Sequence, residues 1–188
     1  AYVLDTTAPT TTVATAAFSA DTGASSTDFI TATAAQTLSG TLSANVVSGE
    51  TVEVSLDNGA TWTNATTSIG ANTWTLSGQT LSGSDTLRVR VKDTAGNAGT
   101  TLSQAYTLDT TAPTVNSVSV PSNATYVLGQ TLDFTVNLSE NVTVNTGGGT
   151  PTLGLTVGAT SRSAAYLSGT GTSALVFRYT VQTGDVDS

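Results

Sequence analysis

AYVLDTTAPT at residues 1–10 recurs as AYTLDTTAPT at residues 105–114, with nine of the ten positions identical. The two copies lie 104 residues apart, which is too long for a solenoid repeat and is the size of one β-sandwich domain, about 100 residues. In each copy a proline, Pro9 or Pro113, restricts the backbone. The DTTAPT segment is therefore expected to be a semi-rigid linker that leads into a first strand, and the chain is predicted to be part of a tandem array.

The composition favours strands and excludes several function classes. Threonine (41 residues) and serine (21 residues) make up a third of the 188-residue chain, and β-branched residues such as threonine favour strands. The chain has no histidine and no cysteine, so a Ser-His-Asp triad, a cysteine nucleophile and the usual zinc site each lack a required residue. We therefore expect that the protein is not an enzyme and that a metal would have oxygen ligands.

Charge and hydropathy exclude two kinds of partner. A net charge of −8 would repel the phosphates of a nucleic acid, which dominate its contacts with proteins. No apolar run approaches the roughly 20 residues needed to cross a bilayer, so no membrane insertion is expected. The first residues lack the basic and apolar regions of a signal peptide, and any export signal is expected to lie outside this fragment.

Short alternating runs separated by Gly, Asn, Asp and Ser predict seven strands in the first repeat. They cover residues 11–18, 36–43, 51–56, 61–68, 73–81, 86–92 and 101–108. Seven strands with one apolar face each predict an all-β fold, an antiparallel immunoglobulin-like sandwich of two sheets. The third and sixth strands are neighbours in such a sandwich. We therefore expect Glu53 on the same outer face as Arg88 or Arg90, with the charged ends within about 6 Å.

The second repeat begins in a similar way and then stops. Alternating apolar residues predict strands near residues 132–138, 153–157 and 175–181. We assign residues 1–109 to a first immunoglobulin-like domain, including an incoming linker at 1–10, and residues 110–188 to a second. The second domain is expected to be incomplete, without its last two strands.

Several segments carry a family resemblance. The first repeat contains DTGASSTDFIT (21–31), VEVSLDNGATW (52–62), VRVKDTAGN (89–97) and LDTTAPT (108–114). In this order and spacing they resemble the bacterial immunoglobulin-like repeats of giant secreted adhesins, and TLDFTVNLSENVTVNTGGGTPTLGLTV (131–157) is similar to a sister repeat often found beside them. The resemblance implies an extracellular, cell-surface protein of the RTX type, exported by the type I pathway and acting in cell adhesion and biofilm formation. It also implies calcium ions that stiffen the array at domain junctions.

The expected strand order collects most acidic residues at the ends of the domains. At the near end of the first domain, which is the end beside the incoming linker, we expect Asp5, Glu50 and Asp93 together with Asn97. At the junction we expect Asp21, Asp28, Asp57 and Asp109 from the first domain and linker, and Glu140 from a loop of the second. Converging carboxylates repel one another unless a cation lies between them, and calcium takes six to eight oxygen ligands of this kind. These residues are our candidate calcium ligands, although aspartate also favours turns for its own local hydrogen bonds.

Two function classes remain open. The first is a structural extender in an adhesin stalk, whose partners are the neighbouring repeats of the same chain. The alternative is an adhesive module that itself binds a cell-surface glycan or protein. Trp62 and Trp74 could form a sugar platform, but packing in the core or on a sheet face is favoured. The basic residues of 88–92 could hold an anionic glycan, but pairing with Glu53 is favoured. Tandem repetition favours the extender, and we expect a monomer.

Overall fold

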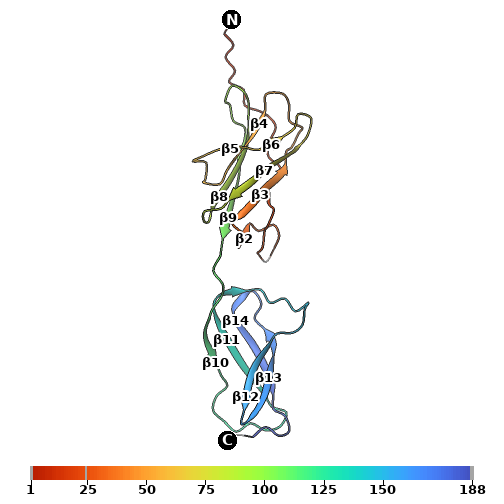
Figure 1. Cartoon of the computed structure of the whole chain (residues 1–188), viewed down its shortest axis with the longest axis vertical. Coiled ribbons are helices and arrows are strands. Elements are labelled where there is room, and N and C mark those ends of the chain that lie inside the picture. The colour runs from red at the N-terminus through yellow and green to blue at the C-terminus, as the bar shows by residue number, and fades with distance from the viewer. Residues whose placement is uncertain (1, 24, 187–188) are drawn as a thin grey trace. The chain divides into compact units, whose positions relative to one another are not determined.

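The computed structural model describes residues 2–23 and 25–186. Contacts divide the chain into two compact units, Ala1–Thr111 (unit 1) and Ala112–Ser188 (unit 2), and each is built from strands and loops (Figure 1). Over the described ranges, the structure has no helix that is long and apolar enough to cross a membrane.

Unit 1 is a sandwich of two sheets. One sheet has the strand order β1-β3-β7-β6 and the other has the order β2-β9-β8-β4-β5. The first contains β1 (Ala17–Phe18), β3 (Ala35–Thr41), β7 (Thr73–Thr80) and β6 (Thr66–Thr67). The second contains β2 (Ile30–Thr31), β9 (Leu102–Leu108), β8 (Asp85–Lys92), β4 (Thr51–Ser55) and β5 (Thr63–Asn64). The predicted immunoglobulin-like sandwich is confirmed for this unit.

The core of unit 1 follows from the period of two along its strands, which turns alternate side chains to the same face. On β8, Leu87, Val89 and Val91 are fully buried, while the residues between them are only partly buried. Trp74 on β7 is 1% exposed and joins the same apolar cluster. Its ring lies against Gly40 on the neighbouring strand β3, where any added Cβ would come within 2.8 Å of a ring carbon. The predicted core position of Trp74 is therefore confirmed.

The strands of unit 1 differ from the prediction in three places. The strand expected at residues 11–18 is only the short β1, with an isolated bridge from Val13 to Leu42 before it. The expected strand at residues 61–68 is two short strands, β5 and β6, which belong to different sheets. The parallel pairing of β2 with β9 was not predicted. A two-residue strand has no periodicity to detect, and β2 follows Phe29, which has a positive φ of 60°.

Unit 2 contains one five-stranded antiparallel sheet in the order β10-β11-β14-β13-β12. Its strands are β10 (Val115–Ser119), β11 (Thr131–Val142), β12 (Thr152–Val157), β13 (Thr160–Ser168) and β14 (Thr172–Thr180). Val136, Ala164, Phe177 and Tyr179 form its small buried cluster, with other apolar side chains partly buried around them. In the described residues, unit 2 thus has one sheet and unit 1 has two.

The strand at β12 lies in an unexpected place. In unit 1 the corresponding predicted strand, β4, lies in the other sheet from β3 and β7, whereas β12 shares one sheet with β11 and β14. The cause is β13, which pairs with β12 on one side and with β14 on the other. The sequence of β13, TSRSAAYLS, has few large apolar residues, so its period of two was not visible.

Candidate calcium sites

The near end of unit 1 is organised by Asn97. Its backbone N–H donates to Asp93 Oδ1 at 2.8 Å. Its side-chain Nδ2 donates to Asp93 Oδ2 at 2.9 Å and to the backbone carbonyl of Asp5 at 3.1 Å, with the carbonyl of Thr7 at 3.5 Å. The hydrogen bond from the Asn97 side chain is the main cause that lowers the pKa of Asp93 below its ordinary 3.8. Three oxygens from two distant parts of the chain therefore converge on one amide group.

The other two acidic residues expected at this end take part in separate contacts. The Asp5 carboxylate accepts a hydrogen bond from Thr7 N at 3.0 Å, so Asp5 meets Asn97 through its carbonyl oxygen. Glu50 Oε2 accepts from the Thr11 hydroxyl at 3.3 Å and from Val47 N at 3.1 Å. The Asp5 carboxylate is thus held by its own loop, and the Glu50 carboxylate by its own loop and by the distant Thr11.

At the other end of unit 1, the carboxylates of Asp21 and Asp28 accept hydrogen bonds from backbone N–H groups of one loop. Asp21 Oδ2 accepts from Phe29 N at 3.0 Å. Asp28 accepts from Ile30 N at 3.1 Å and from Ser25 N at 3.2 Å. The second oxygen of Asp21, Oδ1, is buried and has no donor among the residues that the structure describes. A buried carboxylate oxygen without a partner is rare in folded proteins, and it marks a place where a cation or water would be favourable.

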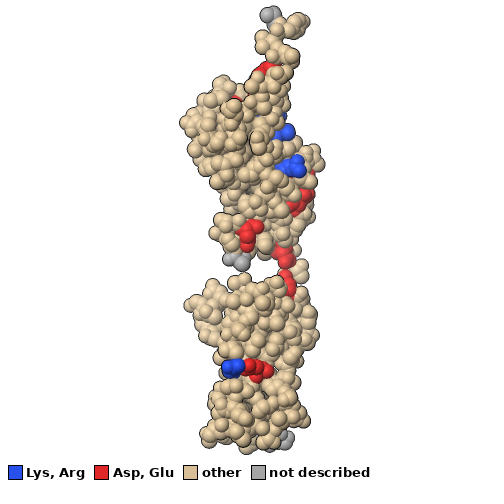
Figure 2. Space-filling view, turned by 180° about the vertical axis from the view of Figure 1, so that it is seen from behind, with Lys and Arg blue, Asp and Glu red and all other residues tan. Residues whose placement is uncertain are grey.

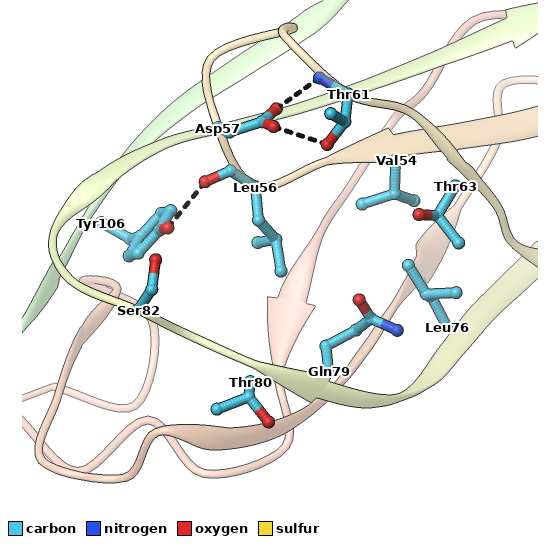
Figure 3. Close-up of a pocket in the computed structure, with 10 residues that line it drawn as sticks. All are labelled: Val54, Leu56, Asp57, Thr61, Thr63, Leu76, Gln79, Thr80, Ser82 and Tyr106. Atoms are coloured by element: carbon cyan, nitrogen blue, oxygen red, sulfur yellow. Dashed lines mark hydrogen bonds between the residues drawn. The ribbon is translucent and has the colours of Figure 1, made fainter.

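Asp57 lies beside a cavity of about 220 Å³ at the same end of unit 1 (Figure 3). Asp57 Oδ1 accepts from Thr61 N at 2.8 Å and from the Ser55 hydroxyl at 2.7 Å, and Oδ2 accepts from the Thr61 hydroxyl. The hydrogen bonds from Thr61 and then Ser55 lower the pKa of Asp57 to about 2. Across the cavity, Tyr106 donates its hydroxyl hydrogen to the carbonyl of Leu56 at 2.7 Å. This carboxylate is thus fixed as an anion by its own turn.

Asp109 and Glu140 belong to the linker and to unit 2. Asp109 N donates to the Thr31 carbonyl at 2.9 Å, and Asp109 Oδ1 accepts from Thr111 N at 2.9 Å. We expected Glu140 in a loop, but it lies within β11, which continues to Val142. Its Oε1 is buried without a partner in the described part of the chain.

Acidic side chains do not gather in large groups. Within the described ranges, no set of three or more acidic residues lies close enough to hold a metal ion. On the face of unit 1 seen in Figure 2, acidic side chains lie mostly towards its ends. Any calcium site in this unit would therefore combine one or two carboxylates with carbonyl, hydroxyl or amide oxygens, all of which calcium accepts.

The predicted pairing of Glu53 with the basic strand is confirmed. Glu53 on β4 lies directly opposite Arg90 on β8, with Glu53 Oε2 at 2.8 Å from Arg90 Nη2. Glu53 Oε1 forms a second ion pair, with Lys92 Nζ. The sequence did not predict that Glu53 would be only 5% exposed. The ring of Trp62 lies 3.8 Å from the Arg90 guanidinium carbon, so the loop before β5 helps to cover this ion cluster.

The sandwich fold of unit 1 agrees with the result of a comparison with known protein families. The model of the bacterial Ig-like domain matches residues 7–110, which is more than half of the chain. The chain therefore belongs to the bacterial Ig-like domain family. Domains of this family are commonly extracellular or surface modules and are typically not enzymes. Comparisons with curated proteins and with solved structures give no match.

Proposed function

We propose that this chain is an extender segment of a large repetitive bacterial adhesin, stiffened by calcium at its domain junctions and supporting cell adhesion and biofilm formation. The recurrence of the ten-residue motif of 1–10 at 105–114 supports a tandem array. An extender gains length from each added copy without needing a binding site in each. Its partners are the neighbouring repeats of the same chain, on the outside of the cell.

The observation that carries the calcium part is the pair of orphaned carboxylate oxygens. Asp21 Oδ1 in unit 1 and Glu140 Oε1 in unit 2 are both buried without a hydrogen-bond donor among the described residues. An unsatisfied buried acceptor costs about 1 to 3 kcal/mol, and more when it is charged. A cation removes that cost, and calcium prefers carboxylate oxygens. In this proposal Asp28, Asp57 and Asp109 are the further ligands at the junction, divided among separate ions because no three acidic residues of the described ranges lie together.

The near end of unit 1 offers a second set of oxygens. Asp93, the carbonyl oxygens of Asp5 and Thr7, and the amide of Asn97 already face one another. A cation would require Asn97 to present its amide oxygen in place of its nitrogen, a rotation that exchanges two groups of nearly equal size. Glu50 would complete the set only by leaving its present donors. In an array, the preceding domain would supply the remaining ligands.

The expected energies suit a protein that is exported before it stiffens. Extracellular modules bind calcium with dissociation constants of about 10⁻⁴ to 10⁻³ M. At ten times that concentration each site stabilises the folded state by about 1.4 kcal/mol. Where free calcium is far lower, as inside a cell, this stabilisation is absent.

The test is calcium binding to the 188-residue chain, measured by calorimetry and by thermal unfolding. Asp21→Asn keeps an acceptor for Phe29 N but removes the charge from the orphaned oxygen. We expect it to weaken calcium binding at least tenfold and to reduce the calcium-dependent rise in unfolding temperature. Asp133→Asn is the matched control, because Asp133 lies in an exposed ion pair with Arg178 in unit 2. Equal calcium binding by both variants and the wild type would refute the assignment of Asp21.

A further inference from the structure

All basic side chains of unit 1 lie on one strand. Arg88, Arg90 and Lys92 alternate along β8 and share the face opposite the core. The remaining basic residues of the chain, Arg162 and Arg178, lie in unit 2, and each has its own carboxylate, at 2.8 Å and 2.6 Å. Figure 2 shows basic side chains of unit 1 on one flank, with acidic side chains below them on the same flank. We call the exposed side of Arg88, Arg90 and Lys92 the basic flank.

The basic flank carries more positive charge than its partner neutralises. Glu53 is bonded by both Arg90 and Lys92, so one carboxylate serves two cations. Arg88 forms no ion pair with any described residue, and its Nε is buried without an acceptor there. In a chain of net charge −8, an uncompensated cluster of positive charge indicates an anionic ligand.

The surroundings of Arg88 determine what kind of anion fits. Its cross-strand neighbours on the sheet are Ser55 on β4 and Ser103 on β9, and Ser103 is exposed. Gly59 packs over the Arg88 stem, where a Cβ would lie 3.5 Å from Cδ. Alternate residues on a strand are about 6.6 to 6.8 Å apart, so the basic flank is a straight row about 13 Å long.

We infer that the basic flank of unit 1 is a binding surface for an anionic polysaccharide, with Arg88 as its principal contact. Arginine bonds carboxylate and sulfate-like groups through two parallel N–H donors, and the hydroxyl of Ser103, which is exposed beside Arg88, can bond a hydroxyl of a sugar. Cations at a regular spacing along one strand suit a linear polymer of repeated charge. This activity adds to the extender role and does not depend on it.

The test uses the 188-residue chain in chelator, so that calcium cannot bridge acidic residues to the polymer. The probes are heparin, which is sulfated, and polygalacturonate, which is carboxylated, with dextran as the neutral polymer and poly-glutamate as the acidic peptide. We expect the wild type to bind heparin and polygalacturonate but not dextran, and to bind poly-glutamate at least tenfold more weakly. We expect the affinity to fall as salt is raised.

Arg88→Gln should weaken polysaccharide binding at least tenfold. Arg178→Gln makes the same change of charge in unit 2 and should leave binding within twofold of the wild type. Tryptophan fluorescence checks folding, because both tryptophans lie in unit 1. If Arg88→Gln does not fold, Lys92→Gln replaces it, with a loss of at least threefold expected. Unchanged binding by the folded variant, no binding by the wild type, equal binding of poly-glutamate, or an equal loss in Arg178→Gln would each overturn the inference.

Discussion

Glu53→Gln should destabilise unit 1 more than any other loss of one negative charge there. The carboxylate is 5% exposed and accepts bonds from Arg90 Nε at 2.9 Å and from Lys92. Glutamine has nearly the same shape, but it is neutral, and its amide nitrogen would meet one of the two cationic donors. The substitution therefore removes one charge-assisted hydrogen bond and weakens the other, without creating a cavity.

The magnitude follows from burial. A hydrogen bond to a charged group contributes about 1.5 to 3 kcal/mol. The side chains of Arg90 and Lys92 are 25% and 32% exposed, so both cations regain part of their hydration when the carboxylate is lost. We therefore expect the free energy of unfolding to fall by about 2 kcal/mol, which is less than the sum of two full hydrogen bonds. For a domain of about 100 residues this lowers the unfolding temperature by about 8 to 16 °C.

Thermal unfolding followed by tryptophan fluorescence measures this directly, because Trp62 and Trp74 are both in unit 1. The pH dependence gives a second readout. Burial raises the pKa of Glu53, but the hydrogen bonds and charges of Lys92 and Arg90 together outweigh it and hold the pKa below 4.5. The carboxylate therefore stabilises the fold fully above about pH 4.5, and this stabilisation is lost as the pH falls through the lower folded-state pKa. The difference in the free energy of unfolding between wild type and Glu53→Gln should be largest at pH 7 and should disappear in acid.

The matched control is Asp85→Asn, which removes one charge from an exposed residue of the same unit and keeps the acceptor for Thr86 N. It should change stability by less than about 0.5 kcal/mol. The assignment of the buried ion cluster would be refuted if Glu53→Gln were as stable as this control. It would also be refuted if the stability difference between wild type and Glu53→Gln stayed constant from pH 7 into acid.

Two further substitutions test the packing of each unit. Gly40→Ala would press a Cβ into the backbone carbonyl oxygen of Thr15 and should lower the stability of unit 1 by about 2 to 3 kcal/mol in the fluorescence assay. Gly83→Ala, with no atom within 4 Å of its added Cβ, should change the stability little. Equal effects would show that the segment around Thr15 does not pack closely on β3. Asp185→Asn should lower the unfolding temperature of unit 2, measured by calorimetry, at pH 7. The Tyr179 hydroxyl is the main cause that lowers the Asp185 pKa to about 2, so the stabilisation shrinks as the pH falls from 3.8 towards that value. A difference between variant and wild type as large at pH 2 as at pH 7 would contradict this.

The sequence predicted the strands whose apolar residues alternate over a long run. Leu87, Val89 and Val91 define β8 in this way, and the same alternation on β4 assigns Glu53 to the outer face that it shares with Arg90. The short strand β2 could not be predicted, because two residues have no period. β13 was missed for a different reason, since its small and polar residues carry no apolar face.

The candidate site was less accessible to sequence reasoning. Strand order indicates the end of the sandwich at which Asp21 or Asp93 lies, but it does not give the donors that already satisfy each carboxylate. The Asn97 amide, bonded to Asp93 and to the distant Asp5 carbonyl, depends on the path of the incoming linker. The burial of Glu53 depends on Trp62 folding over Arg90, a contact that no spacing in the sequence indicates.

The most direct test of the extender proposal is the calcium dependence of domain alignment in the 188-residue chain. Small-angle scattering and residual dipolar couplings should be measured in chelator and at about 10 mM calcium, roughly ten times the weakest expected dissociation constant. We predict that calcium narrows the distribution of interdomain angles and fixes the maximum dimension while the β content of unit 1 stays the same. Asp109→Ala should retain the broad distribution at saturating calcium. Identical maximum dimension and domain alignment in chelator and in calcium would contradict calcium stiffening of the junction.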